Sequence, residues 1–240
     1  MRSIQVLAAI QLFIGLGLIG YSYLDSQPTP HNSNHGLAST KQNHKPLFPK
    51  KLLIKNGKSK VAKTSVLLND PDIYKNWGLK VSSALKARGI TDGSRNVRVA
   101  IIDTGIDVNH KDLKNNLWKN LGETGLDKKG KNKATNGIDD DKNGFIDDVH
   151  GWNFVSNSHS LSDNHGHGTH IAGIVGAEGG NNFGITGISP KVSLMVLKYY
   201  DPKQPGDNLK NTIKAIDYAI NNGAHIINYS GGGTDFSKDE

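Results

Sequence analysis

Three histidines and one aspartate are placed where they could move protons. Residues 165–170, HGHGTH, bring three imidazoles and two glycines to the start of an apolar helical pattern. Upstream, the apolar run 97–102, VRVAII, ends at Asp103. A carboxylate can hold an imidazole in one tautomer and stabilise its cation, while the imidazole takes a proton from a nucleophile. Asp103 and a histidine are therefore candidates for two members of a proton relay, although a single aspartate after a strand is more often a turn or cap residue.

The elements around these residues alternate between strand and helix patterns. The β-branched run 97–102 predicts a strand buried on both faces. Further strands are predicted at 151–155, 192–198 and 225–230. A helix is predicted at 167–177, with Ile171, Ile174 and Val175 facing inward. Another is predicted after Asp207, with an apolar stripe made of Leu209, Ile213, Ile216 and Ile220. This alternation predicts an α/β fold with a parallel sheet, whose ligand sites lie beyond the carboxyl ends of the strands. Asp103 and the stretch 230–231 both fall there.

Several motifs together resemble one enzyme family, the subtilisin-like serine proteases (subtilases). VRVAIIDTGID resembles the aspartate motif of that family and HGHGTHIAGI its histidine motif. GITGISPKVSLMVLK and INNGAHIINYSGGG resemble the two strand segments that follow, and NDPDIYKNWGL the start of the mature domain. The motifs occur in the order of the family and cover about residues 69–233. The resemblance implies a three-layer α/β fold with a mainly parallel sheet.

The resemblance also assigns roles to single residues. Asp103 would be the orienting acid, and His167, which heads the H-G-T-H group, the general base. His165 would border the substrate groove, and His170 would pack or hydrogen-bond in the interior. A further set would line the primary specificity pocket and pair with the backbone of a polypeptide substrate: Ser230, Gly231 and Gly232.

The nucleophilic serine and the oxyanion asparagine of the family belong to later motifs, which do not follow residues 230–233 here. Because triad members act as a unit, we expect residues 68–240 to be the N-terminal portion of a serine endopeptidase domain, with a sheet incomplete at its C-terminus, and to be inactive alone. One alternative is a truncated, non-catalytic homologue that binds peptides or is a gene fragment. A remote alternative is a metallo-β-lactamase-like hydrolase, since HGHGTH resembles H-x-H-x-D-H with Thr169 in place of the aspartate and His225 as a further ligand.

Two sets of residues are candidate calcium ligands. In NGIDDDKNGFIDD, alternate oxygen-bearing residues precede a glycine with the spacing of calcium loops, and the proposed ligands are Asp139, Asp141, Asn143, Phe145 and Asp148, with Asp147 as the alternative to Asp148. The twelfth position is His150 rather than glutamate, so this is no EF-hand, and a solvated acidic turn is the alternative. The resemblance implies a second site made of Asp70, Asp112, Asn181 and the carbonyls of Gly179, Phe183 and Ile185.

Charge and composition exclude several classes of function. The formal net charge is +7, but residues 41–63 hold many lysines and no acid, which is typical of a solvated linker. No aromatic residues alternate with these lysines, so a nucleic-acid site is not predicted. The chain has no cysteine, which excludes disulfides, thiol catalysis and thiolate metal sites.

The N-terminal residues predict export. Residues 4–24 are almost uninterruptedly apolar and follow Arg2, as in a signal peptide or an uncleaved signal anchor that would attach the protein to a membrane. Residues 25–67 then form a basic linker, predicted to be disordered. Either form of the segment would place the rest of the chain in an extracellular or periplasmic space. The oligomeric state is not indicated by the sequence.

Overall fold

The computed structural model describes residues 69–204 and 206–231. The predicted signal segment 1–24, the linker 25–67 and Gly232 lie outside the described residues. Within those residues, no helix combines the length and apolar character needed to cross a membrane.

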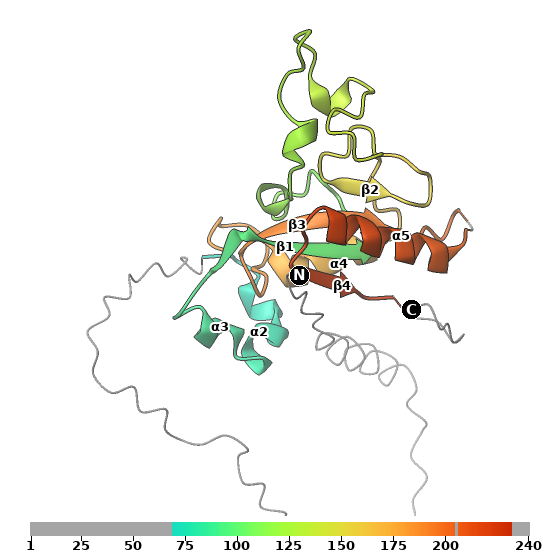
Figure 1. Cartoon of the computed structure of the whole chain (residues 1–240). Coiled ribbons are helices and arrows are strands. Elements are labelled where there is room, and N and C mark those ends of the chain that lie inside the picture. Colours follow the sequence, from blue (N-terminus) through green and yellow to red (C-terminus); the bar gives the residue numbers. More distant parts are fainter. Residues whose placement is uncertain (1–68, 205, 232–240) are drawn as a thin grey trace, which may run out of the picture. The chain divides into compact units, whose positions relative to one another are not determined.

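The described residues form a parallel sheet with helices on both sides (Figure 1). The four strands are β1 (Gly93–Asp103), β2 (Gly151–Asn153), β3 (Lys191–Lys198) and β4 (Ile226–Tyr229). Their order across the sheet is β2-β3-β1-β4, and every pair is parallel. The longer helices are α4 (His167–Gly176) and α5 (Asn208–Asn221). The short elements are η2 (Ile73–Lys75), α2 (Trp77–Val81), α3 (Ala84–Ala87), η3 (Lys114–Asn116), η4 (Leu121–Glu123) and η5 (Lys133–Thr135). The α/β prediction is confirmed.

The predicted strands are present, with shifted ends. β1 begins at Gly93, because exposed polar residues continue the extended chain before the buried run starts. β2 ends at Asn153, two residues before the prediction. The side chain of Asn153 accepts hydrogen bonds from the backbone N–H groups of Val155 (2.9 Å) and Ser156 (3.1 Å), which turns the chain out of the sheet.

Successive residues of the central strands point to opposite faces, and each face is covered by one long helix. On one face, Ala100, Ile102, Met195 and Leu197 belong to a core cluster with Tyr218 of α5. The neighbouring residues of β3 meet α4: a Cβ added at Gly176 would lie 2.5 Å from Val192 and 3.1 Å from Leu194. The sheet therefore lies between α4 and α5, in agreement with the expected three layers.

The buried faces of both long helices differ from the predictions, although in α4 Ile171 is buried as predicted. In α4 the buried residues are Gly168, Ile171, Ala172 and Gly176, while Ile174 and Val175 are only half-buried. In α5 they are Asn211, Thr212, Ala215, Tyr218 and Ala219, and the predicted stripe is half-buried or, at Ile220, 45% exposed. Small residues on the buried faces, among them Ala172, Gly176, Ala215 and Ala219, let these helices approach the sheet closely.

The segment between β1 and β2 is a long excursion made of turns and 3-10 helices. It extends away from the sheet and is drawn in green in Figure 1. Asparagines start two of its helical turns: Asn120 accepts from the N–H of Gly122, and Asn132 from that of Ala134.

Candidate functional site

Asp103 and His167 meet at the carboxyl edge of the sheet. Asp103 is the last residue of β1 and is 3% exposed, and His167 is the first residue of α4. The Nδ1 atom of His167 lies 2.8 Å from Oδ1 of Asp103, and the same oxygen accepts the N–H of Thr104 at 2.8 Å. The His167 side chain is 34% exposed. The pair thus joins a buried carboxylate to an imidazole that reaches solvent.

A glycine makes this contact possible. Gly168 lies so close to the end of β1 that an added Cβ would be 2.1 Å from the carbonyl oxygen of Gly105 and 3.2 Å from the Asp103 carboxylate. Only hydrogen fits between the two backbones at this point. The glycine after His167 is therefore required by the approach of α4 to β1.

This arrangement defines what the imidazole can do. When Nδ1 carries the proton and donates it to Asp103, Nε2 is left as a hydrogen-bond acceptor. An imidazole in that tautomer can take a proton from a hydroxyl group, and the nearby carboxylate then stabilises the cation that forms.

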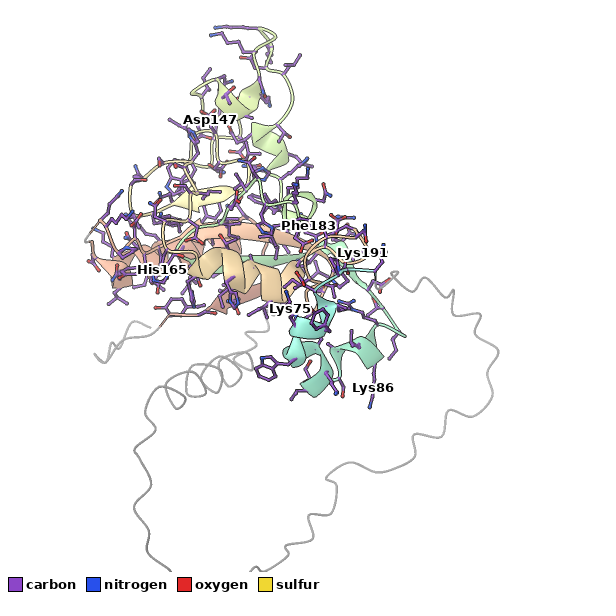
Figure 2. The ribbon with its side chains drawn as sticks, turned by 180° about the vertical axis from the view of Figure 1, so that it is seen from behind. Lys75, Lys86, Asp147, His165, Phe183 and Lys191 are labelled. Carbon is purple, nitrogen blue, oxygen red and sulfur yellow. The ribbon has the colours of Figure 1, made fainter. Side chains whose placement is uncertain are left out.

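The other histidines do not join this pair. His165 is exposed just before α4, with its ring centroid 6.1 Å from that of His167 (Figure 2). His170 is also exposed, so the prediction that it packs in the interior is wrong: Ile171 and Ala172 take the face of α4 that meets the sheet. It lines a surface hollow of about 450 Å³ together with His110.

The metallohydrolase alternative is not supported. His225 precedes β4, and its Nδ1 accepts the N–H of Arg98 at 3.1 Å, near the amino end of the sheet and away from Asp103. Across residues 69–204 and 206–231, no group of metal-ligating side chains includes His165, His167 or His225.

Ser230 and Gly231 follow β4 at the same edge of the sheet as Asp103. Tyr229 pairs with Ile102, so the next residue of each strand emerges side by side. Ser230 accepts a hydrogen bond from the side-chain amide of Asn228 at 2.8 Å. Of the three residues expected to bind substrate, the structure thus brings two near Asp103.

Two tyrosines pack beside this segment. The rings of Tyr199 and Tyr229 are 5.3 Å apart, and a Cβ at Gly231 would lie 2.2 Å from the Tyr199 hydroxyl. Burial and the neighbouring Tyr229 raise the pKa of Tyr199 above its usual range, so this phenol stays protonated. Gly231 has no room for a side chain.

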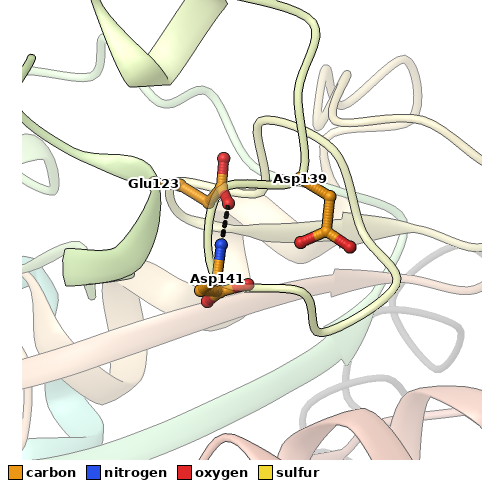
Figure 3. Close-up of side chains that lie close together, drawn as sticks. All are labelled: Glu123, Asp139 and Asp141. Carbon is orange, nitrogen blue, oxygen red and sulfur yellow. Dashed lines mark hydrogen bonds between the residues drawn. The ribbon is translucent and has the colours of Figure 1, made fainter. Parts of the chain in front are cut away.

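The excursion between β1 and β2 gathers three carboxylates, one from the end of η4 and two from the loop after η5, and the one in η4 was not predicted. Glu123, Asp139 and Asp141 each offer an oxygen within 4.8 Å of the others (Figure 3). Glu123 is fully buried, and its Oε1 accepts the N–H groups of Asp140 (2.7 Å) and Asp141 (3.2 Å). Its Oε2 is buried and has no hydrogen-bond partner among the described residues. Burial raises the pKa of Glu123. A buried carboxylate oxygen without a partner, beside two other carboxylates, fits a hard cation such as calcium.

The remaining predicted ligands of this loop lie around the cluster. The backbone N–H of Asn143 donates to Asp139 and Asp141, both at 3.1 Å, while its side-chain amide donates to Asp148 at 2.9 Å. Asp148 is fully buried and also accepts from Tyr218, and burial raises its pKa. The ring of Phe145 packs against the ring of Tyr218, with 4.8 Å between the ring centroids. Asp147 accepts from the N–H of Gly137 at 3.2 Å.

The second set of predicted ligands also comes together. Asp70 and Asp112 are each 2% exposed. The backbone N–H groups of Gly180 and Asn181 donate to Asp70 at 2.9 and 3.1 Å, and the side chain of Asn181 donates to Asp112 at 2.8 Å. Ile185 donates its N–H to Asp112 at 3.0 Å. Two buried carboxylates therefore hold the loop 179–185, which carries Gly179 and Phe183 (Figure 2).

Burial raises the pKa of Asp112, partly opposed by the hydrogen bonds from Asn181 and Ile185. A cation bound between Asp112 and Asp70 would offset that cost, so the buried acids of this site also fit calcium. The structure holds the predicted residues side by side through hydrogen bonds to the loop.

Comparisons with known proteins point to one family. Residues 94–239 match the model of the subtilase family. Subtilisin-like protease 1 of Plasmodium berghei (strain Anka) is 40% identical over 173 residues, which are 70% of this chain and 26% of that protein. Thermitase of Thermoactinomyces vulgaris is 31% identical over 167 residues, 69% of this chain and 48% of that protein.

The chain is also similar to a solved structure, that of fervidolysin from Fervidobacterium pennivorans, a keratinolytic enzyme related to subtilisin. The two are 22% identical with a TM-score of 0.49, and the match covers 77% of this chain and 24% of that one. The chain thus spans about a quarter of the length of the Plasmodium berghei relative and about half that of thermitase.

Proposed function

The chain belongs to the subtilase family, and we propose that it serves as a serine endopeptidase with His167 as the general base and Asp103 as the acid that orients it. The observation that carries the proposal is the 2.8 Å contact between His167 Nδ1 and Asp103 Oδ1 at the carboxyl edge of the sheet. Burial of Asp103 and exposure of His167 suit this division of roles.

The chemistry follows from the two nitrogens of the imidazole. Asp103 accepts the Nδ1 proton, so Nε2 takes the proton of a serine hydroxyl as that oxygen attacks the peptide carbonyl. The imidazolium then donates the proton to the leaving amine, and water hydrolyses the acyl-enzyme with the same base. This step requires a serine hydroxyl at Nε2 of His167, and among the described residues no hydroxyl is hydrogen-bonded to that nitrogen.

The substrate is an extended polypeptide that pairs with the segment 230–232. Within the described part of the chain, β4 pairs only with β1, so its other edge is available for a further strand.

Calcium is the proposed structural cofactor, at one or both acidic sites. Glu123, Asp139 and Asp141 would hold an ion in the excursion between β1 and β2, and Asp70 and Asp112 would hold one against the loop 179–185. Bound calcium would neutralise the buried carboxylates and fix loops that support the region around His167.

The apolar segment 4–24 supports export, with the catalytic domain outside the cytoplasm and either released or attached through this segment. Polypeptides met in that space would be the substrates.

The protein produced in its own host tests the proposal. Residues 68–240 alone are expected to be inactive, whereas the protein as its host makes it should cleave casein and should be blocked by a fluorophosphonate, which reacts with activated serine. Asp103→Asn should lower kcat by about 10⁴-fold, the size of this effect in other serine proteases, because it favours the wrong tautomer of the histidine. Asp207→Asn, a matched change at the cap of α5, should leave kcat unchanged. Lack of cleavage, or cleavage indifferent to Asp103→Asn, would instead support the non-catalytic homologue.

A further inference from the structure

Asp163, four residues before His167, accepts an unusual number of hydrogen bonds. Its Oδ1 accepts from the Thr104 hydroxyl (2.8 Å) and from the backbone N–H groups of Gly166 (2.8 Å) and His165 (3.1 Å). Its Oδ2 accepts from both the N–H (2.8 Å) and the hydroxyl (2.7 Å) of Thr169. The carboxylate therefore gathers donors from the end of β1 and from the start of α4.

These bonds replace a cap that α4 otherwise lacks. The residue before the helix, Gly166, has a φ of 89° and provides no side-chain cap. The first N–H groups of a helix need acceptors from outside it. Gly168 donates its N–H to the Thr104 hydroxyl at 3.0 Å, and Thr169 donates to Asp163.

The environment of Asp163 favours its charged form. Burial disfavours the charge, but the hydrogen bonds from Thr169, Gly166 and Thr104 outweigh burial and lower the pKa of Asp163. Negative charge is also favourable at the N-terminus of a helix. Asp163 is thus an anion at neutral pH, with all of its charge directed at the start of α4 and the end of β1.

The same hydrogen bonds connect the residues that flank Asp103 and His167. Thr104 donates its backbone N–H to Asp103 Oδ1, the oxygen that meets His167 Nδ1. The Thr104 hydroxyl binds Asp163 on one side and the N–H of Gly168 on the other. Both partners of the 2.8 Å contact are therefore linked through Thr104 and Asp163.

Asp163 is itself held in place independently of α4. Lys198, the last residue of β3, donates to the carbonyl of Ser162 at 2.8 Å and to Asp201 at 2.9 Å. Asp201 in turn accepts from the side chain of Asn164 at 3.0 Å. The residues on both sides of Asp163 are thus anchored to the sheet by an almost fully buried ion pair.

We propose that Asp163 is a positioning residue, which sets the contact between His167 and Asp103 by tying the start of α4 to the end of β1. The inference rests on the proposed function, because it matters for catalysis only if the pair acts as a relay. It concerns the contact itself, however, which can be measured without substrate.

The test measures by NMR, on the full chain, how fast the His167 Nδ1 proton exchanges with water. The signal of this proton is assigned by its loss in His167→Ala. In Asp163→Asn, the amide NH₂ must face N–H or O–H donors, so several of them lose their acceptor. We expect the proton to exchange about tenfold faster or more, because the start of α4 loosens from β1. Asp207→Asn is the matched control: Asp207 accepts the N–H of Lys210 at the start of α5 and has no contact with the pair.

Thr104 provides a second variant in case Asp163→Asn does not fold. Thr104→Val removes the hydroxyl that joins Asp163 to Gly168 and should also speed exchange, whereas Thr104→Ser keeps the hydroxyl and should restore the slow rate. Unchanged exchange in either Asp163→Asn or Thr104→Val overturns the inference, as does an equal acceleration in Asp207→Asn. If these rates change as expected in a protein without peptidase activity, the proposed function fails and the positioning role stands.

Discussion

Replacing Gly168 by alanine tests whether α4 has to start against the end of β1. The added Cβ would lie 2.1 Å from the carbonyl oxygen of Gly105 and 3.2 Å from the Asp103 carboxylate. Because the nearest atom belongs to the backbone, it cannot rotate away. The start of α4 must therefore move by more than about 1 Å to reach an ordinary contact distance.

That displacement sets the size of the effect. A shift of this size at Gly168 is passed to His167, the preceding residue, and would break its 2.8 Å contact with Asp103. Inserting a methyl group into a packed site costs about 1 to 3 kcal/mol of unfolding free energy. For a domain of this size, each kcal/mol lowers Tm by roughly 2 to 4 °C. If the protein is active, a misplacement of about 1 Å should cost on the order of 100-fold in kcat.

Gly173→Ala is the matched control in the same helix, because its added Cβ would meet only the side chain of Ile185 at 3.9 Å. Alanine is favoured over glycine inside a helix by about 1 kcal/mol, so this variant should keep or raise Tm. Both variants are compared by thermal unfolding and by the NMR signal of the His167 Nδ1 proton. If Gly168→Ala matches Gly173→Ala in Tm and keeps the slowly exchanging proton, the argument from close approach is refuted.

Two further predictions concern buried carboxylates. Burial raises the pKa of Glu123 in the folded protein, so the ionised carboxylate lowers stability at a pH above its ordinary pKa. With a calcium chelator at neutral pH, Glu123→Gln should therefore raise Tm. With calcium added, the wild type should gain more in Tm than this variant. The exposed Asp217→Asn serves as its control, and an equal response to calcium in all three proteins would contradict the site. The hydrogen bond from Lys198 holds the pKa of Asp201 at about 2, so its contribution to stability is present above the ordinary value of about 4 and lost as the pH falls from about 4 to about 2. Urea unfolding across that range should give a smaller loss for Asp201→Asn than for wild type, and parallel curves would show that the pair has no such role.

The strands and their order along the chain were predictable because local sequence patterns specify them. The run 97–102 has no polar interruption apart from Arg98, and in the sheet Val99 to Ile102 is indeed buried. A helix was expected after Asp207, and the side chain of this residue accepts the N–H of Lys210. The pairing of Asp103 with His167 was expected from two motifs in one order, and the structure puts them in contact.

The buried faces of the helices were not predictable in the same way. Periodicity places apolar residues inward, but α5 turns Ala215, Ala219 and Tyr218 to the sheet and leaves Ile220 half-exposed. A helix that packs on a sheet gains from close approach, which small side chains allow. Tyr218 is buried where its hydroxyl can donate to Asp148, a partner far away in the sequence.

By itself, the sequence determined the alternation of strands and helices, the carboxylate at the end of β1 and the imidazole at the start of α4. Those features depend on backbone sterics and side-chain periodicity, which act over a few residues. Only the tertiary structure decided that Glu123 faces Asp139 and Asp141, and that Asp163 joins the helix to the strand. No spacing in the sequence predicts the role of Glu123 or of Asp163, because that role depends on the N–H groups and charges that the folded chain brings around each carboxylate. The histidine motif thus supplies the base, and the folded chain determines what holds it.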